Sequence, residues 1–401
     1  MPRRGFTLVE ILVALLLLAV TVAGIVALFG SALRLSRAQS SAADLQQSLR
    51  TAQREVLRAV RMAGRGGPAR GPLPVGLALA VHNAAPASGP GSRIAITDPS
   101  TPRVAPGSDV LVVRGVLSSP LFQVEPSGSA SRFEGEPPAA GSVTVRDPSP
   151  TGIPQDLGPL ADAIDGGRPE ALLLVSPLGP HLYAVVELSG GGREDDGSLT
   201  LRFRVRDGLH TSAYLALSPA GVFPPELHTV WQVGILEEHR YYVRAYDDPG
   251  EGPGGVLTRA RFYPGTDAPY AGSAANLSVA IADRILDLQV ALGIDTDADG
   301  TVEESEPPDG SDEWLYNSSQ DTAGAPGWSR RADGRPTRLL YVRLSTAGRG
   351  TRRETNYLAP PFDRLEDRPA ESAVPGSEES VESRSYRRWI LTTLAEPRNL
   401  S

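Results

Sequence analysis

The chain has 401 residues, no cysteine and a formal net charge of −8, and all 39 of its basic side chains are arginine. Without cysteine, a disulfide framework, a thiolate metal site and a thiol nucleophile are excluded. The length fits two or three domains or one elaborated domain, and the negative charge argues against a globally basic nucleic-acid binder while leaving room for a local basic patch.

The first thirty residues carry an unusual export signal. A short leader with two arginines ends at Gly5, Phe6 follows, and a single acid, Glu10, precedes an apolar run over residues 11–29. An ordinary secretory signal is cut after its apolar segment, whereas here the candidate cleavage point between Gly5 and Phe6 comes before it. Processing would therefore leave the apolar helix on the mature protein.

This arrangement resembles the type IV prepilin signal. The resemblance implies that a prepilin peptidase removes residues 1–5, that the new N-terminal Phe6 is methylated, and that Glu10 pairs with the N-terminal amine of a neighbouring subunit. Inserting a carboxylate into a bilayer at the centre of a helix costs about 2.5–3.5 kcal/mol of free energy, so such a group usually has a partner. The alternative is a plain signal anchor whose acid lies at the level of the lipid headgroups.

One long helix is predicted from residue 6 to residue 64. No proline interrupts this stretch, which at 1.5 Å per residue would span about 88 Å. Residues 6–30 would lie in the membrane or in the filament core. Beyond them, apolar residues recur every three or four positions and predict an amphipathic helix whose stripe packs on a globular head: Leu45, Leu49, Ala52, Val56, Val60 and Ala63. The opposite face of this helix is rich in arginine, and we expect these side chains to be solvated or paired with acidic neighbours in a filament.

Residues 65–401 predict a loop-rich β head. Short β-type runs alternate with clusters of Gly, Pro, Ser and Asp, which favours a mostly antiparallel sheet. The clearest runs are residues 109–114, 171–175, 182–186, 201–205, 230–235 and 240–246. The fold class is thus α+β, with a long N-terminal helix on an enlarged head. The region of about 115–235 looks expanded.

Residues 278–294 predict a short amphipathic helix, with Ile281, Ile285, Leu288 and Leu292 on one face. An Asp-rich segment follows and fits the D-x-D-x-D-G-x5-E pattern of calcium loops. Calcium takes six to eight oxygen ligands, and alternating acids around a sharp glycine turn bring several together. The predicted ligands are Asp295, Asp297, Asp299, the Thr301 carbonyl and Glu306, with Glu303 or Glu304 as substitutes for the last. Pro307 and Pro308 exclude a normal exiting helix, and an acidic surface turn without metal is the alternative.

Together, these segments resemble the PilW-type minor pilins, relatives of the J-type pseudopilins of type II secretion. The similarity rests on the leader, the end of the long helix at residues 60–64, the strand at 107–114, the 282–289 segment running into the Asp-rich loop, and the C-terminal stretches 386–394 and 398–400. It implies a minor pilin that primes or caps type IV pilus assembly near the filament tip. The implied partners are other minor pilins, the major pilin, prepilin peptidase and the bacterial inner membrane, where the head is exported before the subunit enters the pilus or pseudopilus.

Two other classes of function compete with this interpretation. The five histidines are scattered, and no nucleophile elbow, Walker A loop or dinucleotide fingerprint directly after a strand is present, so we expect no enzyme. A tip adhesin or DNA-capture subunit is the stronger alternative, because alternating Arg202, Arg204 and Arg206 place three cations on one strand face. Aromatic side chains can add stacking surfaces for bases: Trp231, Tyr241, Tyr242, Tyr246, Trp314, Trp328 and Trp389. A pseudopilin of type II secretion remains the third possibility.

Overall fold

The computed structural model describes most of the chain at the level of backbone and side chains. The described residues are 7–66, 78–95, 101–124, 131–134, 140–167, 170–177, 179–204, 229–248, 252–270, 278–321, 328, 337–353, 357–360, 362, 364–368 and 385–400. The leader predicted at residues 1–5 therefore lies outside the described residues.

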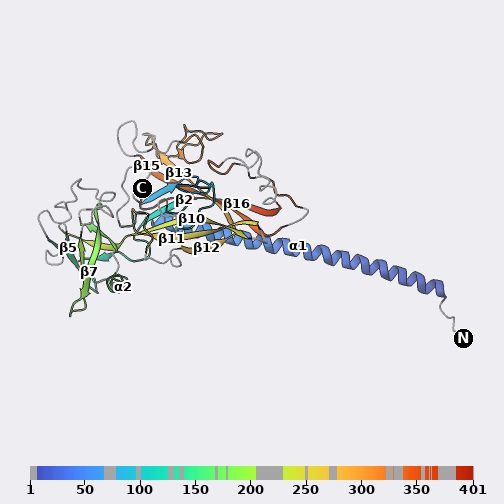
Figure 1. The fold of residues 1–401 in the computed structure, drawn as a ribbon, viewed down its shortest axis with the longest axis horizontal. Coiled ribbons are helices and arrows are strands. Elements are labelled where there is room, and N and C mark those ends of the chain that lie inside the picture. The colour runs from blue at the N-terminus through green and yellow to red at the C-terminus, as the bar shows by residue number, and fades with distance from the viewer. Residues whose placement is uncertain are drawn as a thin grey trace.

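A single helix, α1 (Leu8–Met62), forms the stem of the molecule. It ends where a Gly-rich stretch begins, as predicted from the sequence. Figure 1 shows that its first half extends away from the head, while its second half lies along the strands. The predicted stripe is buried, from Leu45 at 2% exposure to Val56 and Val60 at 0%. The fold is therefore α+β with a large β head, as the sequence predicted.

The buried face of α1 packs against two antiparallel sheets. The first has the order β1-β2-β10-β11-β12, and the second has the order β14-β13-β15-β16. The strands of the first are β1 (Leu79–His82), β2 (Val110–Gly115), β10 (Glu237–Asp248), β11 (Gly252–Phe262) and β12 (Ser278–Asp283). Those of the second are β13 (Ile285–Asp295), β14 (Trp314–Leu315), β15 (Arg338–Arg353) and β16 (Tyr386–Ala395).

The main core lies between α1 and these two sheets. Leu45 and Leu49 of the helix join one cluster with Tyr241 of β10 and Leu288 of β13. The helix approaches β15 closely at Gly348, where an added Cβ would lie 2.9 Å from Leu45 Cδ1. A buried amide fixes the register of this contact. Gln53 donates to the Leu344 carbonyl at 3.2 Å and to the Leu391 carbonyl, and it accepts from the Thr393 hydroxyl.

A third sheet is inserted in the chain between β2 and β10. Its seven strands run in the order β3-β9-β6-β7-β8-β5-β4, and α2 (Gly158–Asp165) packs on it. Its strands are β3 (Phe122–Gln123), β4 (Ser131–Glu134), β5 (Ala140–Val145), β6 (Ala171–Ser176), β7 (Gly179–Arg193), β8 (Leu199–Arg204) and β9 (Gln232–Ile235). In Figure 1 this sheet lies at the opposite end of the molecule from the N-terminus.

The helix predicted at residues 278–294 is wrong. This stretch forms two strands that belong to different sheets, β12 in the first and β13 in the second. The chain turns between them at Arg284, whose φ is 62°. Because β13 is buried on both faces from Leu288 to Asp295, its nearly continuous apolar run matches a helical spacing as well as a strand.

Candidate functional site

The start of α1 is closed by a hydrogen-bonded cap that involves Glu10. Thr7 is the N-cap residue, and its hydroxyl accepts from the Glu10 amide at 3.3 Å. The Glu10 carboxylate in turn accepts from the Thr7 amide and hydroxyl, both at 3.1 Å. This reciprocal pair is a capping box, which satisfies amide donors that the first helical turn leaves free. Gly5 and Phe6 lie outside the described residues.

The first half of α1 carries an uncovered apolar surface. Every large hydrophobic side chain from Leu8 to Leu35 is at least 49% exposed. Its most apolar window of 18 residues has a mean hydropathy of 3.0, and none of it is buried. The helix is thus long and apolar enough to cross a bilayer. An apolar surface of this extent needs lipid or other helices around it.

The Asp-rich loop brings three carboxylates together between β13 and β14. Oxygen atoms of Asp295, Asp297 and Glu313 all lie within 4.8 Å of one another. Asp295 and Glu313 are buried, while Asp297 is exposed. Each of the three also accepts a backbone amide hydrogen, for example Glu313 Oε1 from the Thr296 amide at 2.7 Å. Within the described residues, the Oδ2 atoms of both aspartates accept no hydrogen bond. The group thus offers free carboxylate oxygens, the ligand type that calcium prefers.

The other predicted ligands lie elsewhere in the loop. Asp299 Oδ1 accepts from both the amide and the hydroxyl of Thr301, at 2.7 Å each, and these bonds lower the pKa of Asp299. Glu306 is exposed and precedes a cis proline, outside the group of three. Glu304, one of the proposed substitutes, is held by Arg343 at 2.9 Å.

Glu313 was missed because it lies beyond the span of the calcium-loop pattern. Its position follows from the returning strand, a pairing that the sequence does not reveal: Trp314 pairs with Gly293 in antiparallel register, and the Ile294 amide donates to the Glu313 carbonyl at 2.9 Å. The residue before Trp314 must therefore lie beside the end of β13, next to the first aspartate of the loop.

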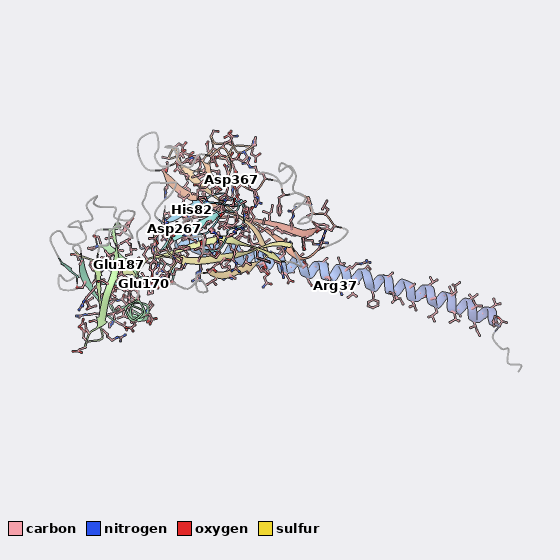
Figure 2. The ribbon with its side chains drawn as sticks, in the orientation of Figure 1. Arg37, His82, Glu170, Glu187, Asp267 and Asp367 are labelled. Carbon is pink, nitrogen blue, oxygen red and sulfur yellow. The ribbon has the colours of Figure 1, made fainter. Side chains whose placement is uncertain are left out.

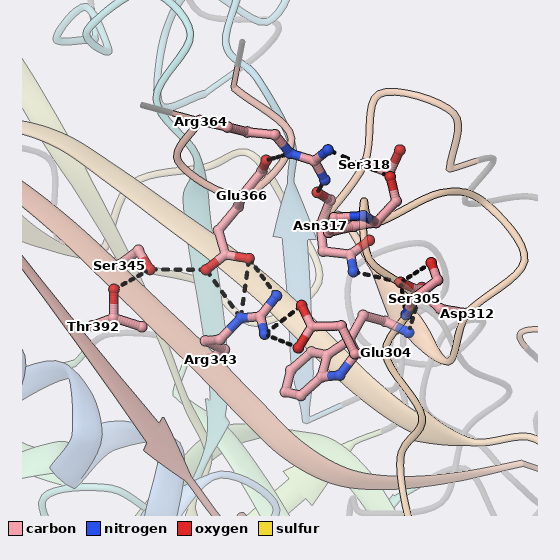
Figure 3. Close-up of polar contacts among 12 residues, drawn as sticks. Glu304, Ser305, Asp312, Asn317, Ser318, Arg343, Ser345, Arg364, Glu366 and Thr392 are labelled. Carbon is pink, nitrogen blue, oxygen red and sulfur yellow. Dashed lines mark hydrogen bonds and ion pairs between the residues drawn. The ribbon is translucent and has the colours of Figure 1, made fainter. Parts of the chain in front are cut away.

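Arg343 anchors the far side of this loop to the second sheet. Figure 3 shows its guanidinium between Glu304 of the loop and Glu366. The contact to Glu366 is 2.8 Å, and the guanidinium also lies 4.1 Å from the centre of the Trp314 ring. Glu366 further accepts from the Ser345 hydroxyl of β15 at 2.8 Å. The loop that carries the acidic group is thus fixed at several points.

A buried set of charges joins the inserted sheet to the first sheet. Glu237 accepts from the Ser118 amide at 2.7 Å and lies 3.3 Å from the Arg261 guanidinium. Arg261 also contacts Glu170, which Figure 2 shows at the border of the inserted sheet. Burial lowers the pKa of His239, which lies 4.0 Å from Glu237, to about 4. These residues fit a structural junction, because the carboxylates among them are already paired.

The residues of the expected adhesive or DNA-capture surface differ widely in exposure. Four of the seven aromatic residues are buried, namely Tyr241, Tyr242, Trp314 and Trp328, whereas Trp231 and Trp389 are 41% and 48% exposed. Arg204 pairs with Glu187 at 2.6 Å, and Arg206 lies outside the described residues. The charge on this strand face is therefore partly neutralised within the chain.

The comparisons with known proteins bear on the N-terminal segment alone. The model of the prokaryotic N-terminal methylation motif matches residues 1–26, which include Gly5, Phe6 and Glu10. No curated protein and no solved structure matches the chain. With the exposed apolar helix on an antiparallel β head, the motif supports a type IV pilin-like or pseudopilin-like protein. It implies processing by prepilin peptidase and assembly with other pilins, and it is consistent with anchoring in a membrane.

Proposed function

We propose that this chain is a PilW-like minor pilin that primes or caps a type IV pilus near its tip. In this role the head is exported across the bacterial inner membrane while α1 stays in the bilayer. After cleavage before Phe6 and methylation of its amine, the subunit joins other minor pilins and the major pilin. The role is structural rather than catalytic.

One observation carries this proposal: an apolar helix that no part of its own head covers, preceded by the methylation motif. From Leu8 to Leu35 the helix makes no buried contact with the head, so its surface is available to lipid and then to neighbouring helices. Glu10 at its start offers a carboxylate whose only described hydrogen bonds are those of the cap with Thr7. A type II secretion pseudopilin would share both features.

The cap suggests two separable roles for Glu10, and a pair of variants distinguishes them. Glu10→Gln keeps a capping side chain, because glutamine also completes a capping box, but it removes the charge. Thr7→Ala removes the cap hydroxyl and keeps the charge. If Glu10 recruits the subunit by pairing with an amine, Glu10→Gln abolishes incorporation into filaments and Thr7→Ala only reduces it.

The measurement is the amount of subunit in sheared filaments, normalised to the amount in membranes. Gly5→Ala serves as the control for blocked processing, and mass analysis of the mature N-terminus checks for methylated Phe6. Wild-type incorporation of Glu10→Gln would refute the assembly role of this charge. Other prepilin genes beside this one would favour a pilus, and genes for secretion components would favour a pseudopilus.

We further propose that the group of Asp295, Asp297 and Glu313 binds calcium. In support, three carboxylates converge in a loop rich in further oxygen donors. Three negative charges so close together repel one another, and a divalent cation would relieve this repulsion. Water and backbone carbonyls would supply the remaining ligands.

A further inference from the structure

A groove follows the exposed side of α1 where the helix lies on the head. It has a volume of about 1040 Å³ and lies between the helix and the strands β11, β12 and β16. Its floor is aliphatic, with Leu57 of the helix, Ile281 of β12 and Leu391 of β16. β12 and β16 are the edge strands of their two sheets.

The rim of this groove is strongly basic. Four arginines of α1 line it, Arg50, Arg54, Arg58 and Arg61, and all four are exposed. Their spacing of three or four residues places them on one side of the helix, where like charges disfavour one another. Glu55 is the only acid among the described residues that line the groove, and it already contacts Arg259 at 3.1 Å.

Within the described chain, no ion pair neutralises these four guanidiniums. Other arginines of the head have close acidic partners, such as Arg114 with Glu238 at 2.6 Å and Arg343 with Glu366 at 2.8 Å. Among the described residues, the row along α1 is therefore a basic surface without an acidic counterpart.

The groove is continuous with the part of α1 that a filament must cover. A smaller hollow lined by Ala43, Gln46 and Gln47 shares Arg50 and Arg54 with it and continues toward the apolar half of the helix. Only a helix, among single segments, satisfies its own backbone in a bilayer. A helix that packs beside the apolar half of α1 would therefore reach the groove if it continued along the same line.

We propose that the groove binds an acidic, amphipathic helical segment of the neighbouring pilin-like subunit. Aliphatic side chains of that segment would pack on Leu57, Ile281 and Leu391, and its aspartates or glutamates would pair with the arginines of the rim. This inference rests on the proposed assembly function and adds the surface and the chemistry of the partner.

Two other anionic occupants fit less well. In a bilayer, lipid headgroups would lie near the end of the apolar stretch at Leu35. Arg50 to Arg61 lie about 22–39 Å further along the helix axis, well beyond a Debye length of about 8 Å. Nucleic acid would gain phosphate contacts, but aromatic side chains for stacking are missing from the described lining. An acidic protein helix satisfies both the charged rim and the aliphatic floor.

The test uses the full-length protein in cells that assemble filaments. Arg54→Glu with Arg58→Glu reverses the charge of the rim, and Arg54→Gln with Arg58→Gln removes it. Arg193→Glu is the control, because Arg193 is an exposed arginine on the inserted sheet and does not line the groove. We expect charge reversal to lower the subunit in sheared filaments about tenfold or more, and charge removal to lower it less. The control, cleavage before Phe6 and the amount in membranes should stay unchanged.

A photo-cross-linking residue in place of Thr51 identifies the occupant. We expect a cross-link to a segment of another pilin-like subunit that carries aspartate or glutamate, lost on charge reversal. Normal incorporation after charge reversal, or cross-links only to lipid or to the same chain, would overturn the inference. Binding of an oligonucleotide by the detergent-solubilised protein that is lost in the reversed variant would assign the groove to nucleic acid instead.

These results separate the two proposals. If Glu10→Gln blocks incorporation and charge reversal does not, the groove inference alone fails. If Glu10→Gln has no effect, the proposed assembly function fails by its own test.

Discussion

Arg261 of β11 bridges two carboxylates from opposite sides of a junction: Glu170, at the border of the inserted sheet, and Glu237, at the start of β10. Each guanidinium-to-carboxylate distance is 3.3 Å. The side chains of Glu170 and Glu237 are only 6% and 2% exposed. One arginine therefore compensates two acids that water barely reaches, and the inserted sheet is joined to the first sheet through it.

Replacing Arg261 should weaken this junction strongly. Arg261→Ala removes the guanidinium that contacts both buried carboxylates, and removing one partner of a buried pair costs about 3–5 kcal/mol. We expect the free energy of unfolding to fall by about 3 kcal/mol, measured by urea titration of the detergent-solubilised protein with tryptophan fluorescence. Arg202→Ala, an exposed arginine of β8, should change it by less than about 0.5 kcal/mol. Equal values for both variants would contradict the structural role of the bridge.

Acid should destabilise the head through His239. Burial holds the pKa of His239 at about 4, against 6.5 in the unfolded chain, so the unfolded state binds the proton more readily. The free energy of unfolding should thus lose about 2–3 kcal/mol as the pH falls from about 6.5 to about 4, and this group should have no effect at higher pH. Denaturant titrations at pH 7.5, 5.5 and 4.5 measure the loss. His239→Gln should show a smaller slope between pH 6.5 and 4; an unchanged slope would assign the effect to other groups.

The contact between α1 and the second sheet should depend on Gln53. This side chain is 3% exposed and bonds to both β15 and β16. Gln53→Leu removes its hydrogen bonds to the Leu344 and Leu391 carbonyls and to the Thr393 hydroxyl, and the Leu391 carbonyl keeps the Thr346 hydroxyl at 3.3 Å. The loss should lower the free energy of unfolding by about 1–3 kcal/mol. Gln47→Leu, on the exposed side of the same helix, is the control and should be close to neutral. Denaturant unfolding of both variants measures the two changes in the free energy of unfolding. Equal changes would contradict a stabilising role of the buried Gln53 amide.

Calcium should raise the melting temperature of the protein if the acidic group binds it. A ligand at 100 times its dissociation constant stabilises the folded state by about 2.7 kcal/mol. Asp297→Asn and Glu313→Gln should each reduce the shift, whereas Glu306→Gln should leave it unchanged because Glu306 lies outside the group. Thermal melts with calcium, with magnesium and with chelator make the comparison. No shift with calcium, or equal loss in all three variants, would contradict the proposed ligand set.

The long helix and several strands were predictable because their patterns are unambiguous. Leu45, Leu49 and Val56 repeat with the helical period over an uninterrupted stretch, and they form the buried face. The run at 171–175 is flanked by Gly and Pro on the N-terminal side and by Pro177 on the other, and it became β6. Helix and strand differ in such segments by their length and their breakers.

The helix prediction at residues 278–294 was wrong for a physical reason. A strand covered on both faces needs apolar residues at nearly every position, so its sequence loses the alternation that identifies strands. The turn at Arg284 added to the error, because a non-glycine residue at positive φ carries no clear sequence signal. Glu313 was missed for a related reason: its place depends on the pairing of β14 with β13, which only the tertiary structure provides. The capping box of Thr7 and Glu10, by contrast, could have been identified from its spacing alone.

The seven-stranded sheet leaves and re-enters the first sheet at neighbouring points, since Gly115 and Glu237 are register partners in the pairing of β2 with β10. The ladder between these strands is therefore complete whatever the chain does between them. A segment attached in this way can be lengthened, exchanged or lost over evolution while the stem and its surrounding strands keep their geometry. We therefore expect changes between residues 116 and 236 to disturb α1 and its two sheets less than changes within β2 or β10.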